Sequence, residues 1–242
     1  MRNSSISILA LAALCAPAWG QSRDQAGTPL NQAQEAALQE WRAEHGASWN
    51  VRIDRATGHL EMLFGGNAAP VFTPDTSEEA DWFALARHWL DSTEELHGVS
   101  TPELVDERFT YLPIGMAYGT DKITVRLNQV VNGLPVEGGV VNALFDTKGR
   151  LLSLHSTASP FTDDLTVAPS FGGRAAVRGA IGAFEAEHGI PAVDVGVPML
   201  LYAQVDRGAG REPLLAYQVV VKNLDVPAGK KYTISAADGA IL

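Results

Sequence analysis

The chain is easiest to interpret from residue 126, where it reads Arg126-Leu-Asn-Gln129-Val-Val-Asn-Gly133-Leu-Pro135-Val136-Glu-Gly138. Apolar and polar residues alternate from Lys122 to Val130, as they do in a strand with one buried face. Asn132-Gly133 follows, and both residues tolerate the positive φ angles of a tight hairpin turn. The stretch therefore predicts a strand, a turn and a return strand that opens at Val136 and continues from Val140 to Phe145.

Similar patterns on both sides extend this hairpin into a sheet. Residues 49–54 and 59–64 alternate in polarity around the turn 54–58, which predicts a second hairpin. A further strand is expected to begin at Phe109. After the turn 146–149, residues 150–155 are predicted to pair back.

Helical periodicity predicts three helices among these strands, at residues 31–44, 77–97 and 175–188. Glycine follows each predicted helix, at Gly46, Gly98 and Gly189, as is typical of a helix end. In the third helix we expect Val177, Ile181 and Phe184 to point inward.

The last part of the chain predicts three more strands, at residues 197–205, 213–224 and 230–242, the last of which includes the turn 237–239. The expected fold class is α+β, with two consecutive subdomains that each combine helix with an antiparallel meander. The predicted divisions are a signal peptide at 1–20, a first subdomain at 21–155, a linker at 156–173 rich in Ser, Thr, Asp, Pro and Gly, and a second subdomain at 174–242.

The first twenty residues have the pattern of a secretory signal peptide. Arg2 precedes an apolar run from Ile6 to Cys15, and small residues at Ala18 and Gly20 predict cleavage near Gly20. The run is too short to span a bilayer, which needs about twenty residues. We expect a secreted or periplasmic protein without a membrane anchor after cleavage. The alternatives are an uncleaved anchor and, disfavoured by Leu14, a lipoprotein.

Composition excludes several classes of function. The net charge of −10 disfavours nucleic acid and anionic membranes as partners. Cys15 is the only cysteine, so the mature chain is expected to hold neither a disulfide nor a cysteine metal site. No His-Glu-x-x-His or G-x-S-x-G motif occurs. We therefore expect no enzyme activity, cofactor or metal.

Three groups of residues leave alternatives open. His88, Glu94 and His97 could be imagined as metal ligands, but histidines near a helix end are commoner. The acidic pairs Asp163-Asp164 and Glu78-Glu79 are expected to be solvated rather than to bind calcium or act as acid and base. The pair Trp82 and Trp89 is interpreted as core anchors rather than an exposed partner surface.

Several of these stretches together resemble the propeptide of secreted zinc metalloproteases of the fungalysin/thermolysin class. Residues 126–153 are similar to its central hairpin, and residues 49–58 with Gly65-Gly66 to its opening. Residues 170–242 look like its PepSY-type half, so that the two subdomains would be cystatin-like and PepSY-like halves. The motif positions, interpreted as structural, are Trp49, Gly58, Arg126, Gln129, Gly133, Pro135, Val136 and Gly138.

The resemblance implies a folding template that also lies across the cleft of its protease. Its partner would be a thermolysin/fungalysin-type zinc metalloprotease, in cis or in trans, and the cleft segment would be Gly239, Ala240, Ile241 and Leu242. The chain ends about where such a propeptide would meet the protease. Two alternatives remain: the front of a precursor whose catalytic part is absent from this chain, or an orphan extracellular binding module.

Overall fold

The computed structural model describes residues 29–115, 121–160, 165–206 and 211–242. The predicted signal peptide and Asp163-Asp164 lie outside these ranges. The described helices are α1 (Gln32–His45), α2 (Glu79–Asp91), α3 (Glu94–His97), the 3-10 helix η1 (Thr101–Glu103) and α4 (Gly173–His188). The described strands are β1 (Asn50–Ile53), β2 (Leu60–Ala68), β3 (Leu104–Leu112), β4 (Lys122–Val131), β5 (Leu134–Asp146), β6 (Leu151–Ser156), β7 (Asp194–Val195), β8 (Met199–Asp206), β9 (Arg211–Asn223) and β10 (Ala228–Ser235).

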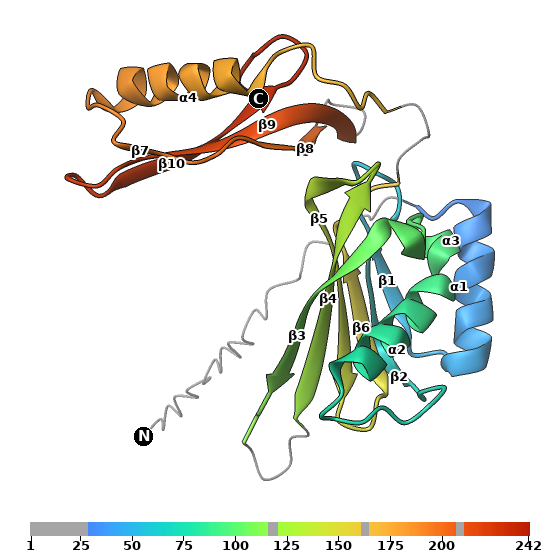
Figure 1. The fold of residues 1–242 in the computed structure, drawn as a ribbon. Coiled ribbons are helices and arrows are strands. Elements are labelled where there is room, and N and C mark those ends of the chain that lie inside the picture. The colour runs from blue at the N-terminus through green and yellow to red at the C-terminus, as the bar shows by residue number, and fades with distance from the viewer. Residues whose placement is uncertain (1–28, 116–120, 161–164, 207–210) are drawn as a thin grey trace, which may run out of the picture.

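The first sheet has the strand order β1-β2-β6-β5-β4-β3, and its neighbours are antiparallel. Helices α1, α2 and α3 cover one of its faces (Figure 1). The residues of β4 that point to this face are fully buried, as the alternation predicted. Strand β2 pairs with β6, and α2 and α3 carry the chain across the sheet before β3 begins.

The second sheet places β9 between β8 and β10, with β7 beside the far end of β9. Helix α4 covers one face of this sheet (Figure 1). One parallel bridge, between Val136 of β5 and Tyr202 of β8, joins the two sheets. The structure confirms the predicted α+β class with helices beside mainly antiparallel sheet.

Tryptophan side chains dominate the core beneath the first sheet. The ring of Trp41 meets those of Trp49 and Trp89 edge-on, with centroids 5.5 and 5.6 Å apart. Trp82 is fully buried against Phe145, at a centroid distance of 5.7 Å. Aromatic pairs of this geometry add stability beyond the area that they bury. Trp82 and Trp89 are therefore core anchors, as the sequence predicted.

The predicted helix 77–97 is in fact two helices, α2 and α3, with a break at Ser92 and Thr93. The hydroxyls of both residues donate hydrogen bonds to the carbonyl oxygen of Trp89, at 2.9 and 2.8 Å. Such side chains compete with the backbone for helical acceptors. The periodicity of the apolar residues could not show this local competition.

Two further predictions for the second half were wrong in detail. The fully buried positions of α4 are Ala176, Ala180 and Phe184. Val177 is partly buried and packs against this cluster, as predicted, whereas Ile181 is only partly buried. Small alanines allow the helix to lie close on the sheet. The last predicted strand ends at Ser235, where the turn reverses the chain so that Ile241 forms an isolated bridge with Ile234.

Candidate protein-binding site

The hairpin between β4 and β5 turns as the sequence predicted. Asn132 and Gly133 have φ angles of 52° and 76°, which few other residues adopt without strain. Beyond the turn, Pro135 pairs with Val130. Pairing then skips to Val140, which is opposite Asn128, so four residues of β5 face one residue of β4. The motif stretch therefore contains a large bulge at residues 136–139.

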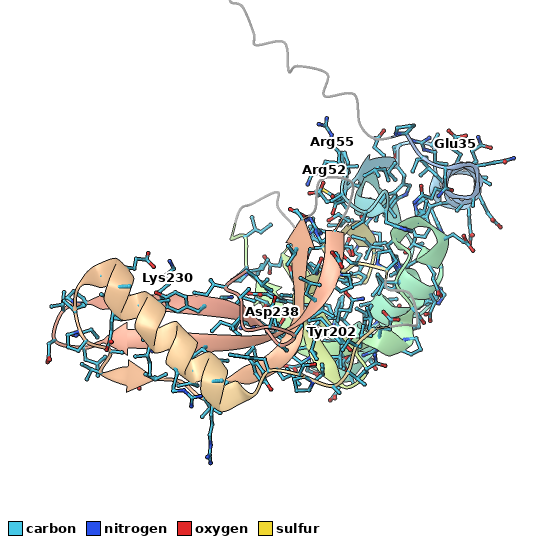
Figure 2. All side chains as sticks on the ribbon, turned by 90° about the horizontal axis from the view of Figure 1, so that it is seen from above. Glu35, Arg52, Arg55, Tyr202, Lys230 and Asp238 are labelled. Atoms are coloured by element: carbon cyan, nitrogen blue, oxygen red, sulfur yellow. The ribbon has the colours of Figure 1, made fainter. Side chains whose placement is uncertain are left out.

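This bulge joins the two sheets. Gly138 has a φ of 72°, and Val136 leaves β4 to pair with Tyr202. The Val136 side chain is buried in a cluster with Tyr202, Leu215 and Ala236 of the second sheet. Tyr202 lies where the two sheets meet (Figure 2). Bulges commonly redirect a strand in this way, and here the redirected strand carries Val136 into a small apolar cluster at the meeting point of the two sheets.

Gln129, opposite the bulge, is fully buried and anchors the connection that follows β6. Its Nε2 donates to the carbonyl oxygen of Ser159 at 2.7 Å, and its Oε1 accepts from the Ser159 backbone N–H at 3.1 Å. The Ser159 hydroxyl in turn donates to Gln204 of β8 at 2.7 Å. A Cβ atom on Gly139 would lie 2.9 Å from Gln129 Oε1, so glycine makes room for this amide.

Glu137 adds contacts between the two sheets, on the face of the second sheet opposite α4. Its Oε1 lies 2.6 Å from Lys231 Nζ and accepts from Gln218 Nε2 at 2.8 Å. A second bridge connects the sheets where Arg211 Nη1 lies 3.0 Å from Asp54 Oδ2. Neither contact was predicted from the sequence. A lone acidic residue carries no sequence signal for a partner 81 or more residues away.

The remaining motif positions support the first sheet. Arg126 forms an ion pair with Glu107 on the neighbouring strand. Trp49 is fully buried, and a Cβ atom on Gly66 would come within 2.4 Å of its indole ring. Gly58 has a φ of 70° in the turn between β1 and β2. Each of these positions is explained by packing or backbone conformation.

The segment Gly239–Leu242 runs back along β10 instead of extending freely. The Ser235 N–H donates to the Ala240 carbonyl oxygen at 2.8 Å, and the Leu242 N–H donates to the Thr233 carbonyl oxygen at 2.9 Å. The side chains of Ile241 and Leu242 nevertheless remain 52% and 43% exposed. The segment thus has extended backbone and presents two apolar side chains to solvent.

The histidine and carboxylate residues do not form a metal centre in the described part of the chain, where no three His, Cys, Asp or Glu side chains gather as ligands. His97 is buried, with Nε2 at 2.9 Å from the Leu90 carbonyl oxygen, and its Nδ1 accepts from the Val99 N–H at 3.1 Å. Burial lowers the pKa of His97 to about 4. The ring is therefore a neutral structural group. The exposed Glu78 and Glu79 lie at the start of α2, in keeping with a solvated pair.

Residues 122–158, which span β4, β5 and β6, match the family model described as Fungalysin/Thermolysin Propeptide Motif. No curated protein matches the chain. Among solved structures, the chain is similar to the Bacillus megaterium YpeB C-terminal domain, with a TM-score of 0.39 and 11% identity over 88% of this chain and 96% of that chain. It is also similar to an uncharacterized protein from Eubacterium rectale, with a TM-score of 0.41 and 10% identity over 89% of this chain and 83% of that chain.

Proposed function

We propose that this chain binds a zinc metalloprotease of the thermolysin/fungalysin type, assists its folding and inhibits it. The observation that carries the proposal is the match of residues 122–158 to the propeptide motif. The comparisons indicate no catalytic family. Propeptides of this class accompany secreted proteases, which supports export of the chain. No helix within the described ranges is long and apolar enough to cross a membrane.

The division of the chain into a propeptide-motif subdomain at 21–155, a linker at 156–173 and a PepSY-like subdomain at 174–242 is part of this proposal. Two separate apolar clusters support it. One, around Trp41, Trp82 and Phe145, lies beneath the first sheet, and the other, around Phe184, lies between α4 and the second sheet. The joint at Val136 would hold the two subdomains in a defined arrangement.

Inhibition would come from the segment Gly239–Leu242 in the cleft of the protease. An extended segment occupies substrate subsites through backbone hydrogen bonds, and its side chains fill the pockets. Pairing with β10 keeps this segment extended before it binds, which lowers the entropic cost of ordering it. The exposed side chains of Ile241 and Leu242 are the apolar groups that the cleft would take up.

The test is inhibition of a thermolysin-class protease by the purified protein, with cleavage of the added protein followed in the same mixture. The variant Ile241→Asp should inhibit at least tenfold less tightly, because an apolar pocket would have to bury a charge (about 1.4 kcal/mol for each factor of ten). Val167→Asp, at an exposed valine elsewhere, is the matched control. Equal inhibition by wild type and Ile241→Asp would remove this segment from the mechanism.

A further inference from the structure

The free edge of the second sheet lies along β10. Strand β10 pairs with β9 on one side. On the other side the segment Gly239–Leu242, called the tail below, covers only Thr233, Ile234 and Ser235. On the side away from β9, residues 228–232 have no strand beside them within the described ranges. Unpaired backbone groups of an edge strand are a template for another strand.

Hydrogen bonds already present fix which backbone groups face outward. The carbonyl oxygen of Thr233 and the N–H of Ser235 bond to the tail. In an antiparallel sheet every second residue of a strand turns both backbone groups to the same side, so this set of residues in β10 faces away from β9. By this alternation Lys231 and Gly229 face outward as well. The pairing with β9 supports this assignment, since Lys231 is opposite Val220 and Gly229 is opposite Lys222. The carbonyl oxygens of Val220 and Lys222 accept from the N–H groups of Gly196 and Val193, on the side of β9 away from β10. The edge therefore offers two N–H groups and two carbonyl groups.

Beside this edge lies an apolar groove of about 500 Å³ at the end of the β9–β10 hairpin. Its apolar lining includes Val220 and Leu224, which are 36% and 68% exposed. Gly229 contributes no side chain and leaves the groove open toward the edge. Helix α4 lies on the opposite face of the sheet (Figure 1). A partner strand on the edge would have a place for an apolar side chain.

The charge around the groove is unusual for this chain. Lys222, Lys230 and Lys231 line it, and these are three of the five lysines in a chain with a net charge of −10. Lys230 is held beside the edge by Glu187, at 2.6 Å, and Lys231 by Glu137, also at 2.6 Å. Lys230 lies beside α4 (Figure 2). Glu187 and Glu137 offset part of this charge, and Lys222 adds a lysine for which no ion pair is found within the described ranges. An edge lysine repels basic strands and favours acidic ones by cross-strand pairing.

We propose that β10 accepts an extended acidic segment of a partner protein by strand addition. The segment would lie antiparallel to β10, in line with the tail, and exchange hydrogen bonds with Lys231 and then Gly229. Apolar side chains at alternate positions would enter the groove, and the carboxylates between them would lie on the α4 face beside Lys230. This surface needs no protease and does not depend on the proposed function.

The two edges of the first sheet suit strand addition less well. Strand β1 has only four residues, and its pairing with β2 shifts between Arg52 and Ile53. Strand β3 has a bulge between Asp106 and Arg108. Short strands and bulges are the devices that keep an edge from pairing. The unpaired part of β10 has a continuous register with β9.

The probe is a fluorescent peptide with the sequence Glu-Val-Glu-Val-Glu-Val, and binding to the full chain is measured by anisotropy. The same peptide with lysine in place of glutamate should bind at least tenfold more weakly. Peptides methylated at alternate backbone nitrogens form a second pair. Methylation of the nitrogens that face β10 should abolish binding, whereas methylation of the other nitrogens should leave it unchanged.

The variant Gly229→Pro removes one outward N–H and should weaken binding of the acidic peptide about tenfold or more. Gly229→Ala keeps the N–H and places a Cβ 3.2 Å from the flexible Lys222 side chain, so it should bind like the wild type. Equal binding of the acidic and basic peptides, or of the two methylated peptides, would overturn the proposal. A wild-type dimer in light scattering that Gly229→Pro separates would also overturn it, since the edge would then serve a second copy.

Discussion

Acidification should destabilise the first sheet and its helices through His97. This imidazole is 1% exposed, and both ring nitrogens are engaged: Nε2–H donates to Leu90, and Nδ1 accepts from Val99. Protonation would place a hydrogen on Nδ1 against the Val99 N–H and a charge in the core. Burial therefore lowers the pKa of His97 from 6.5 to about 4.

The sign of the effect follows from proton binding. Between pH 6.5 and 4 the unfolded chain binds the proton and the folded chain does not, so the free energy of unfolding falls as the pH falls. The contribution of His97 is complete above pH 6.5. These two pKa values predict a loss of about 2 kcal/mol by pH 5 and about 3 kcal/mol by pH 4.

Urea unfolding at pH 7.5 and pH 5, followed by tryptophan fluorescence, measures this loss. His97→Gln keeps a donor and an acceptor but does not titrate, so it should lose about 2 kcal/mol less than wild type between the two pH values. His88→Gln, at an exposed histidine of α2, should behave like wild type. Parallel pH dependence of wild type and His97→Gln would refute the assignment of a buried neutral imidazole.

Two glycine substitutions and one amide substitution test the packing by urea unfolding. Gly66→Ala should destabilise by about 1–3 kcal/mol, because its Cβ would lie 2.4 Å from the Trp49 ring. Gly182→Ala in α4, where a Cβ meets open space, should instead stabilise by about 0.5–1 kcal/mol, and a loss of stability there would contradict the described helix. Gln129→Leu should cost about 2–4 kcal/mol by leaving both backbone groups of Ser159 unpaired, and a neutral effect would show that water replaces them.

Local sequence signals predicted the parts of the fold that depend on neighbours in sequence. Alternation placed β4, and Asn132-Gly133 placed its turn, because positive φ and one buried face leave a direct imprint on residue type. Glycine marked the ends of α1 and α4 at Gly46 and Gly189 for the same reason. The α+β class followed from these elements.

Contacts between distant parts of the chain could not be predicted in this way. The bulge at residues 136–139 depends on Tyr202 and Leu215, which lie far along the chain in another sheet. The break after α2 depends on hydroxyl hydrogen bonds that apolar periodicity ignores. The pairing of β2 with β6 depends on where the helices cross. Each correction arose where a tertiary contact or a single side chain outweighed the local pattern.

The positions shared with the propeptide motif have a structural explanation in this chain. Val136 is buried in the apolar cluster between the two sheets, Gln129 holds the connection after β6, and Gly133 turns the hairpin. Because this stretch joins the two sheets, few of its side chains are free to contact a partner. Partner recognition is therefore better sought on the exposed surfaces of the second half, at Gly239–Leu242 and along β10. Because the two surfaces share one strand, a partner on one of them would change the backbone neighbours of the other.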